Sequence, residues 1–226
     1  MRYAFYISGS SQRLFKFISK IEKEKNELER ICMVISDAEI PIFLKKALER
    51  NHIPFVLIEY KALGENNKER NLKLSVRILE LLSGKKIDYM FSFGSHILAG
   101  DLLEQYKWRL INFHPALLPM YPGDRAIDQA IAHGNTLLVG NTAHFIDEGM
   151  DTGRIIMQSA VPLQVFWDSG SNYDSILDLQ INMLEMLISL LEENRVRVEN
   201  DRVRILGADY TKSMIFPYID GMETIF

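Results

Sequence analysis

Residues 111–123 read Ile-Asn-Phe-His-Pro-Ala-Leu-Leu-Pro-Met-Tyr-Pro-Gly, and this stretch decides the fold. It begins as the end of a buried strand, entered through the apolar Leu110, and continues as a proline-rich loop. Side chains alternate along a strand, so Asn112 and His114 share one face and Phe113 lies on the other. Ligands of parallel α/β sheets bind just past the carboxyl ends of strands. The pattern therefore predicts two polar side chains at a ligand site.

An amide beside an imidazole suits a reaction in which negative charge develops on an oxygen atom. Asn112 and His114 supply these two groups, and Asp151 supplies a carboxylate 37 residues beyond the histidine. A carboxylate next to an imidazole orients the ring and raises its affinity for a proton, or relays a proton through water. Only the fold can bring the three together, and the alternative is that His114 is a hydrogen-bonded loop residue.

The chain before this stretch alternates between strands and helices. We expect strands at 2–8, 31–36, 54–58, 89–93 and 110–113, and helices at 12–23, 40–51 and 67–82. Alternation at this spacing is typical of a parallel, doubly wound sheet with right-handed crossovers. The sequence therefore predicts an α/β fold, a mostly parallel twisted sheet with helices on both faces.

The pattern changes after residue 123. We expect helices at 126–133 and 174–193, strands at 137–145 and 154–162 around a glycine-flanked loop at 147–153, and a β-hairpin from 196–198 and 203–206. The apolar tail predicts packing on the body or at a subunit interface, which makes a homodimer plausible; its apolar residues are Ile215, Phe216, Tyr218, Ile225 and Phe226. With no linker or repeat, we expect a single domain over 1–226: an N-terminal half at 1–110, a core at 111–165 and a C-terminal part at 166–226.

Composition excludes several classes of function. The net charge of −4 and the lack of a basic stripe argue against nucleic-acid binding. Cys32 is the single cysteine, so no internal disulfide can form and a reducing compartment is expected. Neither a signal peptide nor a membrane-spanning run is evident, so we expect a cytoplasmic protein with no membrane partner. The five histidines show no metal-ligand spacing, so no metal is expected.

Five short blocks follow one another in a distinctive order: NFHP at 112–115, LLP at 117–119, PG at 122–123, TAHF at 142–145 and DEGMDTGRII at 147–156. In their order and spacing they resemble the folate-dependent formyltransferase family, which includes glycinamide ribonucleotide formyltransferases and sugar N-formyltransferases. The order of strands and helices agrees over the first 160 residues. The resemblance implies a Rossmann-like formyltransferase fold.

The resemblance also implies an activity, the transfer of a formyl group from 10-formyltetrahydrofolate, as cosubstrate, to a primary amine. Asn112 and His114 would contact the formyl oxygen, and Asp151 would assist proton transfer and position the histidine. The bond before Pro119 would be cis. Further supporting residues would be Gly123, Thr142 and His144, with a strand histidine satisfied by hydrogen bonds as the alternative for His144.

Two stretches would bind the folate in a protein of this family. They are His96, Ile97 and Leu98 after the fourth strand, and Asp147, Glu148, Gly149 and Met150 before the aspartate. Apolar walls with backbone donors and acceptors suit a flat heteroaromatic ring. The alternative is that Ile97 and Leu98 are core residues.

The first strand–helix turn would bind a phosphate of the acceptor, through Gly9, Ser10, Ser11 and Arg13. The alternative is an ordinary turn with a serine N-cap. Relatives place an acceptor-binding glutamate on the late helix, where our alignment puts Leu184 with Glu185 adjacent.

Several functions remain open at this point. A glycinamide ribonucleotide-like acceptor would place the enzyme in purine biosynthesis, and an amino-sugar nucleotide is the close rival. A hydrolase that releases formate from the folate, and a non-catalytic regulator that binds folate or a nucleotide, are the alternatives from other classes.

Overall fold

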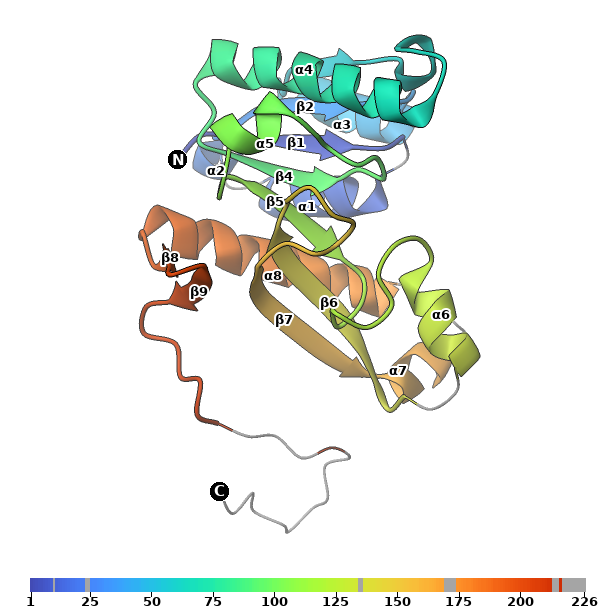
Figure 1. Ribbon diagram of the computed structural model, residues 1–226, viewed down its shortest axis with the longest axis vertical. Coiled ribbons are helices and arrows are strands. Elements are labelled where there is room, and N and C mark those ends of the chain that lie inside the picture. The colour runs from blue at the N-terminus through green and yellow to red at the C-terminus, as the bar shows by residue number, and fades with distance from the viewer. Residues whose placement is uncertain (10, 23–24, 134–135, 169–173, 213–215, 217–226) are drawn as a thin grey trace.

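The computed structural model describes residues 1–9, 11–22, 25–133, 136–168, 174–212 and 216. One seven-stranded sheet runs through the molecule in the order β3-β2-β1-β4-β5-β6-β7, with helices on both faces (Figure 1). The α/β fold class and the mostly parallel sheet are confirmed. Within the described residues, no helix is long and apolar enough to span a bilayer.

The first five strands pair in parallel. They are β1 (Tyr3–Ile7), β2 (Ile31–Ser36), β3 (Phe55–Leu57), β4 (Tyr89–Phe93) and β5 (Leu110–His114). Of these, β1, β2, β4 and β5 are largely buried on both faces, and the edge strand β3 is half-buried. Phe5 packs with one apolar cluster and Tyr6, the next residue, with the other. Burial of both faces explains why these strands read as apolar runs in the sequence.

The helices form two layers, one on each face of the parallel strands. Their bounds are α1 (Gln12–Ile21), α2 (Lys25–Leu28), α3 (Ile42–Arg50), the 3-10 turn η1 (Tyr60–Ala62), α4 (Asn67–Lys85), α5 (Asp101–Gln105), α6 (Ala126–His133), α7 (Leu163–Asp168) and α8 (Asp174–Glu192). Residues of α1, α3 and α8 share one cluster with Phe5, and residues of α4 and α5 share the other with Tyr6.

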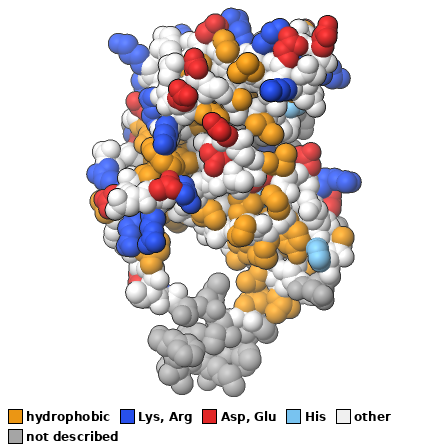
Figure 2. Space-filling model, in the orientation of Figure 1, with side chains coloured by type: hydrophobic (Ala, Val, Ile, Leu, Met, Phe, Trp, Pro, Cys, Tyr) orange, Lys and Arg blue, Asp and Glu red, His pale blue; other side chains and the backbone are white. Residues whose placement is uncertain are grey.

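An antiparallel ribbon completes the sheet. In it, β6 (Leu138–Phe145) pairs with β5 on one side and with β7 (Ile155–Pro162) on the other. Hydrophobic side chains gather over this ribbon on the face seen in Figure 2, where Ile155 is 39% exposed. A separate hairpin follows α8, formed by β8 (Val196–Glu199) and β9 (Arg202–Ile205).

The expected elements are present, with ends that differ by at most three residues. The short helices α2, α5 and α7 were not predicted, because four to six residues hold less than two turns of periodic pattern. Of the apolar tail, Ile215, Tyr218, Ile225 and Phe226 lie outside the described residues, so the predicted packing of the tail stays a prediction.

Candidate active site

The site forms where the sheet changes from parallel to antiparallel. Strand β5 pairs with β4 in parallel and with β6 in antiparallel register, which sets Asn112 opposite His144 and His114 opposite Thr142. Asn112, His114, His144 and Asp151 all line one cavity of about 280 Å³. Phe113 points to the other side, into the core with Phe91 and Phe93, as the alternation of side chains predicts.

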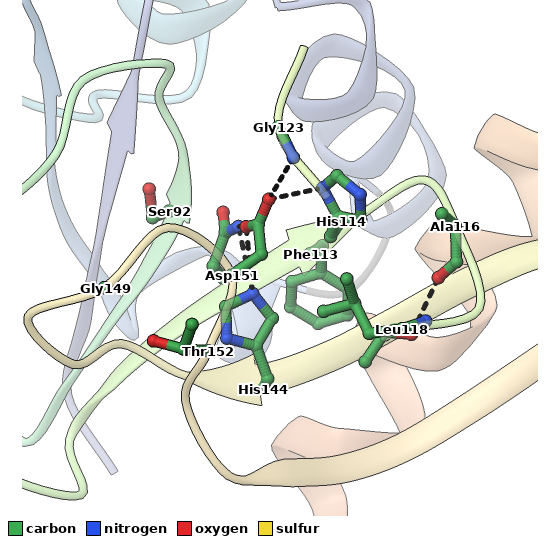
Figure 3. A network of polar contacts seen from close by, with 12 residues as sticks. Ser92, Phe113, His114, Ala116, Leu118, Gly123, His144, Gly149, Asp151 and Thr152 are labelled. Atoms are coloured by element: carbon green, nitrogen blue, oxygen red, sulfur yellow. Dashed lines mark hydrogen bonds and ion pairs between the residues drawn. The ribbon is translucent and has the colours of Figure 1, made fainter. Parts of the chain in front are cut away.

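Asp151 is the centre of this arrangement, and its two carboxylate oxygens have separate partners (Figure 3). Oδ2 lies 3.2 Å from Nδ1 of His114 and accepts a hydrogen bond of 2.8 Å from the Gly123 amide. Oδ1 lies 3.4 Å from Nε2 of His144 and accepts a hydrogen bond of 3.4 Å from Nδ2 of Asn112. The structure thus brings together the three residues predicted as catalytic and adds His144 to them.

Opposing effects act on the pKa of Asp151. Its side chain is only 11% exposed, and burial raises the pKa. The hydrogen bond with His144, the Gly123 amide and the positive charges available on His114 and His144 lower it, and together they outweigh burial. The pKa of Asp151 therefore lies below its ordinary value, and the group is a carboxylate at neutral pH.

Backbone carbonyls set the orientation of both histidine rings. Nε2 of His114 donates to the carbonyl of Tyr121 at 2.8 Å, and Nδ1 of His144 donates to the carbonyl of Phe145 at 2.9 Å. A carbonyl only accepts, so each of these nitrogens carries a proton. The other nitrogen of each ring then faces Asp151, and that nitrogen is where a proton can be gained or lost.

Asn112 contacts both the aspartate and the second histidine. Its Nδ2 lies 3.3 Å from Nε2 of His144, in addition to the contact with Asp151. When Nε2 of His144 is unprotonated, it accepts from this amide; when it is protonated, it donates to Asp151 instead. The hydrogen bonds available to Asn112 therefore depend on the proton held by His144.

Special backbone conformations bring the loop of Asp151 over the sheet. Asp151 has φ of 55°, a left-handed conformation that aspartate tolerates, and Gly123 has φ of 81°. Gly153 lies against the carbonyl of Phe145, where a Cβ atom would come within 1.7 Å of the oxygen. Only glycine allows this close approach, which fixes the loop next to β6.

The proline-rich loop after β5 is held by Thr142 of β6. The Thr142 hydroxyl donates to the Ala116 carbonyl at 2.7 Å and accepts from the Leu118 amide at 3.0 Å. Gln158 of β7 donates to the same hydroxyl at 2.9 Å and to the Leu118 carbonyl at 3.0 Å. Thr142 thus faces this loop, and the predicted cis bond between Leu118 and Pro119 is present.

The residues predicted to bind folate lie along one side of the cavity. His96, Ile97, Leu98, Asp147, Gly149 and Met150 are among its lining residues, whereas Glu148 is not. Leu98 is 2% exposed and also belongs to a core cluster, while Ile97 is 38% exposed. The Asp147 carboxylate closes its own loop by accepting from the Gly149 amide and the Thr152 hydroxyl.

The ring of His96 is held by an aromatic ring and a carboxylate. It stacks on Tyr60 with 3.5 Å between ring centroids and 9° between the planes, and its Nε2 lies 3.7 Å from the buried carboxylate of Asp37. Asp37 also accepts from the hydroxyls of Tyr6 and Ser8. This network, which the sequence reasoning missed, joins the ends of β1 and β2 to the loop after β4.

The residues predicted to bind the acceptor's phosphate are not gathered around one cavity. Ser11 is buried and caps α1 by accepting from the Leu14 amide, and Ser10 lies outside the described residues. Gly9 adopts φ of 59° but does not line the cavity. Arg13, the second residue of α1, does line it.

Neither Leu184 nor Glu185 of α8 is among the residues that line the cavity. Leu184 is fully buried in the core, and Glu185 forms an exposed ion pair with Lys20. Gln180 of α8 contacts a residue of the cavity, because its Oε1 lies 3.5 Å from Nη1 of Arg13. Gln180 lies four residues before Leu184, about one helical turn, so the two residues share a face of the helix, and this spacing could have identified Gln180 from the sequence.

Among the described residues, no group of three or more histidine, cysteine, aspartate or glutamate side chains is arranged to hold a metal ion. Asp151 instead pairs with imidazoles and amides. The site offers hydrogen-bond donors and a proton-holding carboxylate–histidine pair, which suit acyl or formyl transfer.

Comparison with known proteins gives one consistent result. The formyl transferase family model matches residues 1–188. The phosphoribosylglycinamide formyltransferase of Bacillus subtilis (strain 168) is 32% identical over 163 residues, which are 72% of this chain and 80% of that protein. The solved structure of glycinamide ribonucleotide transformylase 1 from Symbiobacterium toebii has a TM-score of 0.77 at 28% identity and covers 91% of this chain and 94% of its own.

A second activity occurs among proteins of the same fold. A formyltetrahydrofolate deformylase from Pseudomonas syringae pv. tomato str. DC3000 has a TM-score of 0.74 over 90% of this chain and 65% of its own. At 21% identity this is a likeness of fold alone. The family model and the Bacillus relative agree on the larger class, and the chain belongs to the formyl transferase family.

Proposed function

We propose that the protein is an N-formyltransferase that moves a formyl group from 10-formyltetrahydrofolate to the primary amine of a small phosphorylated acceptor resembling glycinamide ribonucleotide. The observation that carries the proposal is Asp151, held between His114 and His144 and beside Asn112 at one cavity. The names of the Bacillus relative and of the Symbiobacterium structure support the acceptor.

The catalytic roles follow from hydrogen-bonding capacity. Attack of an amine on a formyl carbon places negative charge on the formyl oxygen and positive charge on the nitrogen. The Asn112 amide and a protonated His114 stabilise the negative charge, a kind of contribution worth roughly 10²- to 10³-fold in rate per donor. Asp151, a carboxylate at neutral pH, takes up the amine's proton through water. Collapse of the intermediate then breaks the bond between the formyl carbon and N10 of the folate, and N10 receives that proton as it leaves.

The two ends of the cavity suit the two substrates. Ile97, Leu98 and Met150 supply apolar walls, and the backbone of the 147–150 loop supplies donors and acceptors for the pterin ring. Arg13, the second residue of α1, also lines the cavity and contacts Gln180 of α8. We place the acceptor there, and Gly123, Thr142, His144 and Pro119 support the loops between the two substrates.

The proposed compartment is the cytoplasm, the site of a folate-dependent step that supplies purine biosynthesis. The thiol of Cys32, which is free in the structure, is compatible with a reducing environment.

The decisive experiment follows the absorbance of the folate product. Purified protein is incubated with 10-formyltetrahydrofolate and with glycinamide ribonucleotide, with a panel of amino-sugar nucleotides, or with no amine. Product formation only with the ribonucleotide supports the proposal, whereas turnover only with a sugar nucleotide replaces its acceptor. Formate release without any amine would assign the hydrolase reaction instead.

The matched variant is Asn112→Leu, which keeps the side-chain volume and removes the amide. We expect kcat to fall by about 10²-fold or more. Asp209→Asn, at an exposed site far from the cavity, is the control and keeps the wild-type rate. Equal rates for Asn112→Leu and the control would remove Asn112 from the mechanism.

A further inference from the structure

Asp37 is a buried carboxylate that directly follows β2. Its Oδ2 accepts from the Tyr6 hydroxyl at 2.5 Å and from the Ser8 hydroxyl at 2.6 Å, and Nε2 of His96 lies 3.7 Å from the same oxygen. Among the described residues, His96 is the one side chain able to carry a positive charge that pairs with this carboxylate. Burying a carboxylate costs free energy unless partners compensate it, and here all three partners come from the end of β1 or from the loop after β4.

The Ser8 hydroxyl links Asp37 to the start of the loop at 95–98. A hydroxyl has one proton and two lone pairs. Ser8 donates its proton to Asp37, and it accepts from the Ser95 amide at 2.8 Å and from the Ser95 hydroxyl at 3.0 Å, so its hydrogen-bonding capacity is fully used. Because a carboxylate only accepts, it fixes the direction of the Ser8 proton and leaves both lone pairs for Ser95.

His96, the next residue of the loop, is held between Asp37 and Tyr60. Its ring stacks on Tyr60 with 3.5 Å between the ring centroids and 9° between the planes. Tyr60 is itself fixed, because its hydroxyl donates to Oδ1 of Asn71 in α4 at 2.7 Å. The side chain of His96 is 30% exposed and lines the cavity, so these two contacts orient a ring that is open to a ligand.

Both ends of the loop are held, whereas the amides in its middle are left for a ligand. Gly94 lies so close to the Tyr6 ring that a Cβ atom would come within 2.1 Å of it, and the Ala99 amide donates to Ser75 of α4 at 2.9 Å. Among the hydrogen bonds of the described residues, the amides of residues 96–98 have no partner. A segment with fixed ends and free amides is preorganised for a flat ring that carries hydrogen-bond acceptors.

We propose that Asp37 is a positioning residue for the folate: acting through Ser8 and His96, it holds the loop at 95–98 in the conformation that receives the pterin ring. The described residues that line the cavity do not include Asp37, Ser8 or Tyr60, so the effect of these side chains on the ligand passes through the loop. The inference rests on the proposed function. It assigns control of folate affinity to a charged residue at the end of β2, two strands away from β4 in the sheet.

Binding of tetrahydrofolate tests the proposal without an acceptor. Anaerobic isothermal titration calorimetry measures its Kd for the wild type, for Asp37→Asn, which keeps the shape and removes the charge, and for Ser8→Ala, which removes the link to Ser95. We expect the Kd to rise about 10- to 100-fold in both variants, the scale of a hydrogen bond to a charged group. Asp209→Asn, at a half-exposed site on the C-terminal segment, is the control and keeps the wild-type Kd.

A Kd within about threefold of the wild-type value in the two variants would overturn the proposal. Circular dichroism first establishes that each variant folds. If Asp37→Asn does not fold, Ser8→Ala decides the question, because the Ser8 side chain is only partly buried and its loss leaves no buried charge behind.

Hydrogen exchange of single amides, followed by NMR in the ligand-free protein, reports on the loop itself. We expect the Ser95 amide to exchange faster in Asp37→Asn and in Ser8→Ala, because its acceptor is displaced or lost. The Ala99 amide, which donates to Ser75, should keep its wild-type rate. Unchanged exchange at Ser95, or equal acceleration of both amides, would overturn the role of Asp37 in positioning the loop.

Kinetics separate this inference from the proposed function. With the amine that the wild type formylates, the folate KM of both variants should rise about 10- to 100-fold. The values of kcat and of the acceptor KM should stay within about threefold, because the contacts of Asp151 with its neighbours are unchanged. If the wild type transfers formyl and the variants keep its folate KM, this inference alone fails. If the wild type neither binds tetrahydrofolate nor transfers formyl, the proposed function fails and this inference fails with it.

Discussion

Burial and hydrogen bonding act on Asp151 in opposite directions, and the hydrogen bonds prevail. A carboxylate in a closed cavity would normally favour its neutral form. Here two imidazole nitrogens, one backbone amide and one side-chain amide contact its two oxygens. These contacts keep the Asp151 carboxylate negatively charged at neutral pH.

For Asp151→Asn, we expect kcat to fall by about 10²-fold or more, because the variant can no longer accept a proton. Steady-state turnover measures the loss. Asp209→Asn, an exposed aspartate of the C-terminal segment, is the control for the loss of one negative charge. A variant that retains a third or more of the wild-type kcat would contradict the role of Asp151.

The same substitution has a pH-dependent effect on stability. The pKa of Asp151 is lowered in the folded protein, so its charged form stabilises the fold at pH values above the ordinary carboxyl pKa of about 4. That stabilisation is lost as the pH falls through the lower, folded-state pKa. We expect urea unfolding to show a stability gap between the wild type and Asp151→Asn that is constant from pH 7 to pH 5 and shrinks below about pH 4. A gap that widens in acid would mean that burial dominates.

The sequence alone identifies some of these residues but not their contacts. Asn112 and His114 follow from strand alternation, which is local information. The contact between His144 and Asp151 depends on the antiparallel register of β6, and the contact of Arg13 with Gln180 spans 167 positions. Neither contact can be predicted from the spacing of residues along the chain, and a single glutamine in a helix gives no indication that it contacts an arginine elsewhere.

At the scale of elements, the Thr142 hydroxyl of β6 connects the proline-rich loop after β5 to β6 and β7. Replacing Thr142 with valine keeps the shape but leaves the buried Leu118 amide without its acceptor. We expect a loss of about 1–3 kcal/mol in the free energy of unfolding. Thr142→Ser keeps the hydroxyl and should lose less. Guanidinium unfolding compares the two, and a larger loss for Thr142→Ser than for Thr142→Val would show that the methyl group, rather than the hydroxyl, fixes the loop.

Two adjacent residues of α8 make unequal contributions to stability. Leu184 is fully buried, so Leu184→Ala should cost about 2–5 kcal/mol. Glu185→Gln breaks only the ion pair with Lys20, two half-exposed side chains, and should cost less than about 1 kcal/mol. Chemical unfolding of both variants checks the orientation of α8, and a reversed order would mean that the helix is rotated about its axis.

The long elements were predictable because their apolar residues repeat over several turns or alternations. The helix α4 and the strands β2 and β4 begin at the residues expected from the sequence. Three short helices were missed, and α5 follows a glycine with φ of 68° whose conformation no pattern of apolar residues reveals.

Across the whole molecule, burial is uneven along the sheet. Every residue of β1 is buried, whereas β8 and β9 alternate between exposed and half-buried residues. Amide hydrogen exchange should therefore be slowest in β1 and its neighbours β2 and β4, and faster by orders of magnitude in the hairpin at 196–205. Equal protection of hairpin and core would indicate that the two unfold together.

The orienting partners of the active-site side chains have one property in common. The carbonyls of Tyr121 and Phe145 hold the two histidines, the Gly123 amide holds Asp151, and the carbonyls of Phe93 and Phe113 hold Arg13. These groups belong to the main chain, so substitution of the side chain at the same positions, other than by proline, leaves them in place. At these positions the geometry of the site therefore tolerates changes of side chain, whereas the contacts of Asp151 with His114, His144 and Asn112 need the side chains themselves.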